Sequence, residues 1–140
     1  MAPAEVTGSI SLEDLRSRGE VTYVDDVGIT SGWELSNRWE ASDPRLSGTS
    51  IEATTWHRYP QGFTVVSTTF GVENDDGRWV GTSTGMEGSG FFTDTAVLHG
   101  EGAYEGLTAY LMMDLARDAG TIRGLVVADD LPPFPEPAAE

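Results

Sequence analysis

Hydrophobic and polar residues alternate along most of the chain, which is the period of a β-strand with one buried face. Clear examples are the segments 33–41, 109–115 and 122–126, where every second position is predominantly apolar or glycine. Turn sequences separate such segments, among them "YPQG" at 59–62 and "NDDG" at 74–77. The pattern predicts about seven or eight short antiparallel strands.

A sheet of this size avoids exposed edges by closing on itself. The expected fold class is therefore all-β, an antiparallel closed barrel of about eight strands. One early segment differs, because Ser11 can cap a helix, Leu12 and Leu15 would share one face of it, and Gly19 would end it. These signals predict a short N-terminal helix near residues 12–18 that lies outside the barrel or covers one end.

The length of 140 residues suits one domain. We expect an N-terminal segment with the short helix (1–19), a β-barrel domain (20–130) and an acidic, proline-rich tail (131–140). The tail is expected to be extended and solvated.

The alternation also predicts which side chains face the inside of the barrel. One parity of neighbouring strands is apolar, and its members are the candidate substrate-binding residues: Trp33, Leu35, Trp39, Val66, Phe70, Trp79, Leu111 and Met113. His57 and Tyr59 stand near a strand end and are the candidate catalytic pair at the mouth, His57 as an acid–base group. The alternative for His57 is a strand histidine at the rim or on the surface.

Composition excludes several classes of partner. The 23 acidic residues against 8 basic ones give a formal charge of -15, which disfavours nucleic acid and anionic membranes. The chain has no cysteine, so thiol chemistry and disulfides are excluded. No apolar run could span a bilayer as a helix and no signal peptide is evident, so a cytoplasmic protein is expected. The residues suggest no metal site and no cofactor.

Two short motifs imitate known sites. The glycines of "GEGAYEG" (100–106) lack the spacing and the following helix of a dinucleotide-binding loop. "GTSTG" (81–85) places Ser83 like the nucleophile of a hydrolase, but the match lies inside a predicted strand and not in a strand–turn–helix elbow. A glycine-rich, curved strand is the better interpretation.

The stretch Gly100-Glu101-Gly102-Ala103-Tyr104-Glu105-Gly106, followed by a strand, resembles the hallmark of the allene oxide cyclase-like barrels, which are related in shape to dirigent proteins. "GAYEGLTAY" is also similar to the corresponding segment of small bacterial barrels that close spirotetronate and spirotetramate polyketides by [4+2] cycloaddition. The resemblance implies a bulged corner between two strands, whose aromatic ring plugs the barrel end. It also implies a homodimer or homotrimer.

Two classes of function follow. The first is a cofactor-independent cyclase or isomerase of a small hydrophobic, polyketide-like molecule, including [4+2] cycloaddition, that works by confinement in an aromatic lumen. The alternative is a non-catalytic carrier or resistance protein that binds a hydrophobic small molecule, or a barrel whose lumen is only a packed core. A cavity of about 300 Å³ or more inside the barrel would favour a ligand site.

Overall fold

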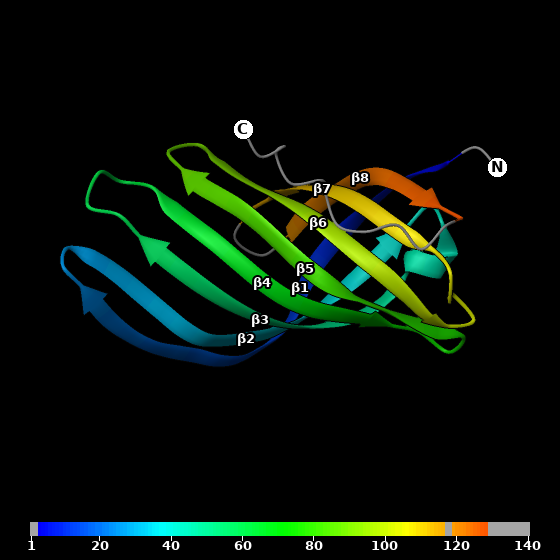
Figure 1. Ribbon diagram of the computed structural model, residues 1–140, viewed down its shortest axis with the longest axis horizontal. Helices are drawn as coiled ribbons and strands as arrows, with labels where there is room; N and C mark the ends of the chain where they lie inside the picture. Colours follow the sequence, from blue (N-terminus) through cyan, green and yellow to red (C-terminus); the bar gives the residue numbers. More distant parts are fainter. Residues whose placement is uncertain (1–2, 117–118, 129–140) are drawn as a thin grey trace, which may run out of the picture.

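The computed structural model describes residues 3–116 and 119–128 as a ring of eight antiparallel strands (Figure 1). The strands are β1 (Ala4–Val24), β2 (Val27–Ala41), β3 (Gly48–Arg58), β4 (Thr64–Glu73), β5 (Gly77–Gly88), β6 (Phe91–Gly102), β7 (Thr108–Leu115) and β8 (Ala119–Val127). Each strand pairs with the next, and β8 pairs back with β1. The all-β prediction is confirmed. Within the described residues, no helix has the length and apolar character needed to cross a membrane.

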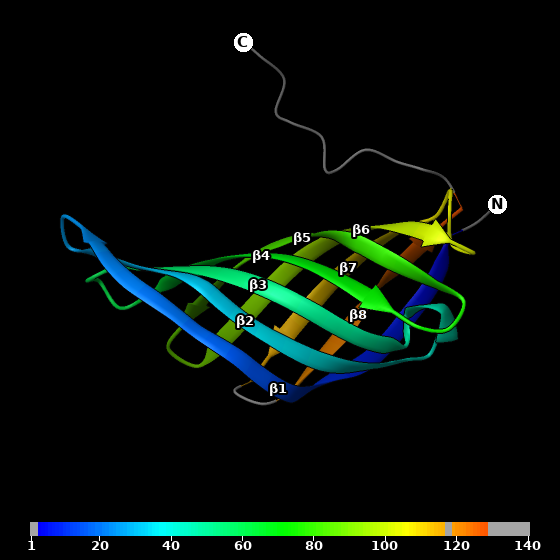
Figure 2. The same ribbon diagram turned by 90° about the horizontal axis from the view of Figure 1, so that it is seen from below.

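The connections divide the ring into two ends (Figures 1 and 2). The β1–β2, β3–β4 and β5–β6 turns gather at one end, which we call the open end. The other end, the closed end, carries the 3-10 turn η1 (Pro44–Leu46) and the β4–β5 and β6–β7 connections.

The predicted N-terminal helix is wrong, because residues 12–18 belong to β1. The pairing of β1 with β2 shifts by one residue between Leu12 and Asp14, and again between Leu15 and Ser17. Each shift inserts an extra residue into β1, so side chains three apart face the same way. Leu12 and Leu15 therefore both line the inside of the ring, as they would share one face of a helix. Two β-bulges imitate the helical period. The strand also crosses the expected boundary at residue 19, while the expected tail (131–140) lies outside the described residues.

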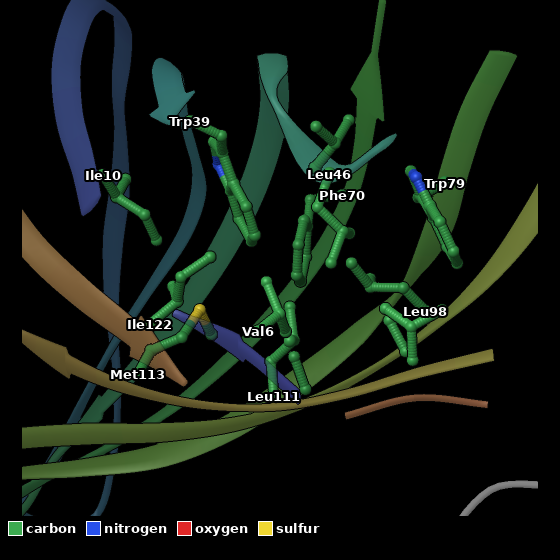
Figure 3. Close-up of a cluster of buried hydrophobic side chains, with 14 of the residues drawn as sticks. Val6, Ile10, Trp39, Leu46, Phe70, Trp79, Leu98, Leu111, Met113 and Ile122 are labelled. Atoms are coloured by element: carbon green, nitrogen blue, oxygen red, sulfur yellow. The ribbon is translucent and has the colours of Figure 1, made fainter. Parts of the chain in front are cut away.

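Buried side chains fill the ring toward the closed end and form one hydrophobic core (Figure 3). Trp39 and Phe70 pack with ring centroids 5.7 Å apart, and Trp79 has no exposed surface. The core also contains Val6, Ile10, Leu46, Val72, Leu98, Leu111, Met113, Ile122 and Val126. Because these residues alternate along their strands with outward-facing ones, the apolar parity predicted from the sequence is the inner face.

The glycine-rich corner closes this end as expected. β6 ends at Gly102, and both Gly102 and Gly106 adopt positive φ angles, of 65° and 85°, which favour glycine. Tyr104 is buried between them and stacks on Trp79 with ring centroids 5.3 Å apart. A side chain at Gly100 would collide with the backbone of Tyr104. The corner is therefore a plug and offers no helix N-terminus to a phosphate.

Candidate functional site

A cavity of about 670 Å³ occupies the ring toward the open end. Its volume lies within the range of small-molecule sites and well above the 300 Å³ set as the criterion for a ligand site. All eight strands contribute to its walls, which include the apolar side chains Ile10, Leu12, Leu15, Leu35, Val66 and Leu115. The cavity continues where the packed core ends.

Three aromatic rings form one wall of the cavity. Trp33 and Trp56 meet edge to face, with centroids 6.1 Å apart, and Trp56 meets Phe92 in the same manner at 5.6 Å. Two arginines cover this wall at the mouth: the guanidinium of Arg18 lies 5.9 Å from the Trp33 ring, and that of Arg58 lies 6.0 Å from the Trp56 ring. The wall offers flat apolar surface to a ligand.

Polar side chains form a belt between this aromatic wall and the packed core. Thr54 on β3 and Thr68 on β4 share a hydrogen bond of 2.9 Å between their hydroxyl groups. Ser83 on β5 is the next residue across the sheet from Thr68, and all three are almost fully buried. Two carboxyl groups, those of Glu52 and Asp94, line the same cavity.

Glu52 extends from β3 into the cavity and is held by two hydrogen bonds. Asn37 Nδ2 donates to Glu52 Oε2 over 2.7 Å, and Ser50 Oγ donates to the same oxygen. Burial raises the pKa of the Glu52 carboxyl, while these two hydrogen bonds lower it in part. Because both donors meet Oε2, Oε1 is the oxygen that can carry a proton.

Asp94 extends from β6 and is 6% exposed. Ser83 Oγ donates to its Oδ2 over 3.5 Å, whereas Oδ1 is buried without a hydrogen-bond partner among the described residues. Burial raises the pKa of Asp94 to about 6; the Ser83 hydrogen bond lowers it and the charge of Glu52 raises it further. A carboxyl group with this pKa changes its charge near neutral pH.

The "GTSTG" segment is part of β5, which confirms a strand in place of a nucleophile elbow. Its glycines make room for β6: a Cβ at Gly81 would meet the carbonyl oxygen of Val97 and the side chain of Leu98, and one at Gly85 would meet the side chain of Asp94. Ser83, between them, contacts the Asp94 carboxyl group. The segment therefore forms the surface against which the Asp94 side chain packs.

The structure separates the predicted binding residues into two groups. Trp33, Leu35 and Val66 line the cavity. The remaining five belong to the buried core cluster: Trp39, Phe70, Trp79, Leu111 and Met113. All eight therefore lie inside the ring, but five of them pack in the core and do not line the cavity. Their role in substrate binding stays a prediction.

His57 and Tyr59 are not among the residues that line the cavity. His57 pairs with Ile29 and Val65 and has the opposite parity to Trp56, so it stands on the outer side of β3. Tyr59 lies in the β3–β4 turn and stacks on Phe63 at 4.7 Å. The structure does not bring this pair to the cavity.

Sequence reasoning missed Glu52 and Asp94, although a signal for each was present. Glu52 has the same strand parity as Trp56, and Asp94 has the same parity as Leu98. An acidic residue on the apolar parity of a strand indicates a buried carboxyl group, and buried carboxyl groups cluster at functional sites.

Comparison with known proteins found no matching family model, no similar curated protein and no similar solved structure.

Proposed function

We propose that the chain is a cofactor-independent cyclase or isomerase that acts on a small hydrophobic, polyketide-like molecule held in the cavity. The observation that carries this proposal is the presence of Glu52 and Asp94 in an aromatic cavity, with no cationic side chain of the described residues in an ion pair with either. Burying a carboxyl group in this way costs free energy that packing alone would avoid. An active site explains the arrangement because it needs polar groups that water does not solvate.

The aromatic wall and the carboxyl groups would have different tasks. Trp33, Trp56 and Phe92 would fold a flexible substrate into a reactive conformer and exclude water. A protonated carboxyl group would donate a hydrogen bond to a substrate carbonyl and polarise it. We further propose that the ring belongs among the allene oxide cyclase-like barrels; the corner around Tyr104, with its positive-φ glycines, supports this.

The carrier hypothesis is the second candidate, and exposed apolar side chains at the cavity favour it. Leu12 is 38% exposed and Phe91 is 48% exposed, and both line the cavity. Such a rim suits the entry of an apolar ligand whether or not chemistry follows.

A binding experiment tests the site itself. N-phenyl-1-naphthylamine, a neutral dye that fluoresces in apolar surroundings, should bind the wild-type chain. Leu35→Trp fills the cavity and should weaken binding at least tenfold, whereas Ala53→Trp, on the exposed outer parity of β3, should leave it unchanged. Equal binding by all three proteins would reject the cavity as the site.

A turnover experiment separates the enzyme from the carrier. The probe is a linear polyene that carries an acyl tetramate, and the product is read by mass spectrometry and chromatography. A cyclic isomer of unchanged mass, formed by the wild type and lost in Leu35→Trp, supports the cyclase. Tight binding of the polyene without any conversion favours the carrier.

A further inference from the structure

We propose that this cavity catalyses proton transfer next to a carbonyl group, with Glu52 as the base and Asp94 as the hydrogen-bond donor to the carbonyl oxygen. The inference rests on the proposed function, because it assumes that the cavity admits a small apolar substrate. It goes beyond confinement, because it assigns two catalytic residues and a substrate class: ketones with acidic protons beside the carbonyl.

The two carboxyl groups have different surroundings, which suit them to different roles. Glu52 Oε2 accepts from Asn37 and Ser50, so the side chain is fixed and Oε1 is left to accept a proton. Asp94 accepts only from Ser83 among the described residues, over 3.5 Å, and its Oδ1 has no partner. Hydrogen bonds that a carboxyl group accepts stabilise its ionised form, so Glu52 is the carboxylate of the pair. Asp94, which has fewer such bonds, keeps the proton.

The charges that surround Asp94 support the same division. The residue opposite Asp94 on β7 is the apolar Met113, and the one opposite on β5 is Gly85. The charged groups that line the cavity are Glu52 and Arg58 on β3, Glu87 on β5 and Arg18 on β1. The two arginines lie over the tryptophans at the mouth. Glu52 and Asp94 therefore disfavour simultaneous ionisation, so one stays protonated while the other acts as a base.

The chemistry balances without an oxidant, a reductant or a metal. The C–H bond next to the carbonyl breaks, the proton passes to the Glu52 carboxylate, and the electron pair moves to the carbonyl oxygen, which accepts a hydrogen bond from the protonated Asp94. Return of the proton to the same carbon regenerates the ketone. Return to the γ carbon of a β,γ-unsaturated ketone gives the conjugated isomer.

Hydrogen–deuterium exchange measures the first step directly. The probe is 2-tetralone, a ketone with acidic protons beside its carbonyl, and the readout is the loss of those proton signals in D₂O buffer. The wild type should accelerate exchange over buffer, and Glu52→Gln should lose about a hundredfold or more of that acceleration. Asp94→Asn, which can still donate, should retain more activity than Asp94→Ala. Asp114→Asn, an exposed acid on β7, is the matched control and should match the wild type.

The pH profile of the wild type is a test that needs no variant. The pKa of Asp94, raised by burial to about 6, predicts a rate that decreases as pH rises above 6, because the donor loses its proton. A flat profile between pH 6 and 8 would overturn the assignment of Asp94 as the donor.

The outcomes separate this inference from the proposed function. Absence of exchange in the wild type, with N-phenyl-1-naphthylamine bound in the cavity, rejects proton transfer and leaves a binding cavity intact. Absence of dye binding rejects the proposed function itself. Exchange that persists in a folded Glu52→Gln variant, with folding checked by circular dichroism, rejects Glu52 as the base.

Discussion

The carboxyl group of Asp94 lies directly against the Cα of Gly85 on the neighbouring strand. A Cβ built on Gly85 would occupy the space of Asp94 Oδ1 and of the Thr93 carbonyl oxygen. The glycine thus lets the carboxyl group turn across β5, away from water and within reach of Ser83. The absence of one side chain creates the environment that raises the pKa of Asp94.

Gly85→Ala should therefore destabilise the fold. The added methyl group must displace Asp94 or the β6 backbone, and overpacking of this kind costs about 1–3 kcal/mol of the free energy of unfolding. Gly71→Ala on β4 is the control, because its Cβ would have contacts of 3.4 Å or more. Urea unfolding measures both variants, and a loss in Gly71→Ala as large as that in Gly85→Ala would contradict the explanation.

The raised pKa of Asp94 predicts how stability depends on pH. In the unfolded chain an aspartate has a pKa of about 3.9, whereas in the folded protein the value is about 6. Between these values the folded state holds a proton that the unfolded state has released, so the contribution of Asp94 to stability falls as pH rises through this range. Above about pH 6 a constant penalty remains.

Asp94→Asn removes that penalty, because the amide does not ionise. At pH 7 the variant should be more stable than the wild type by about 1–3 kcal/mol, and the difference should shrink steadily as pH falls toward 5. Urea unfolding at several pH values measures it, with Asp114→Asn as the control for a lost surface charge. A difference that stays the same from pH 5 to 7.5 would show that Asp94 has an ordinary pKa.

The inner face of the ring could be predicted from the sequence because strand alternation is a local property. Trp39, Phe70 and Leu111 have the apolar parity of their strands, and all three are buried as that parity requires. The glycine corner was predictable for a similar reason: only glycine suits the positive φ angles at Gly102 and Gly106.

The bulges of β1 could not be predicted in the same way. An extra residue changes the period from two to three, and a run such as Leu12, Leu15 and Arg18 then fits a helix as well as a strand. Pairing with β2 decides between a helix and a bulged strand. That pairing depends on residues far along the chain, so the sequence around residues 12–18 does not reveal it.

The position of the cavity could not be predicted from the sequence for a different reason. Parity states that a side chain faces inward, but it does not state whether that side chain meets the core or an empty space. Trp33 and Trp39 have the same parity six residues apart, yet the first lines the cavity and the second is packed in the core. The division depends on how far each strand extends beyond the core.

The homo-oligomer that the resemblance implies has a candidate interface on the outer face of the ring. Met112 is 53% exposed and Leu125 is 39% exposed on neighbouring strands of the outer face. We predict a homodimer or homotrimer that buries this face, and Met112→Glu should shift it toward a monomer of 15.0 kDa. Light scattering coupled to size exclusion measures the mass. Met86→Glu, on the outer face of β5, should have no effect, and a monomeric wild type at high micromolar concentration would contradict the prediction.

A hydrogen-bond network centred on Asn74 links the segments of the closed end. Tyr104 Oη donates to Asn74 Oδ1 over 2.7 Å, and Asn74 Nδ2 donates to the carbonyl oxygens of Arg45 and Ser47 over 3.0 and 2.9 Å. Trp79 Nε1 donates to the same Arg45 carbonyl oxygen over 2.8 Å. One amide therefore joins η1, the β4–β5 turn and the glycine corner.

Removing one partner of Asn74 should lower the free energy of unfolding less than removing the Asn74 amide itself. Tyr104→Phe loses a single hydrogen bond and should lower the free energy of unfolding by about 1 kcal/mol. Asn74→Ala leaves several partners unsatisfied and should lower it by about 2–4 kcal/mol, because each buried group that loses its partner adds a desolvation cost. Tyr23→Phe, whose ring is 75% exposed, is the control and should change stability by less than about 0.5 kcal/mol. Urea unfolding gives the order of the three losses, and a Tyr104→Phe loss equal to that of Asn74→Ala would show that the phenol, and not the amide, holds the closed end together.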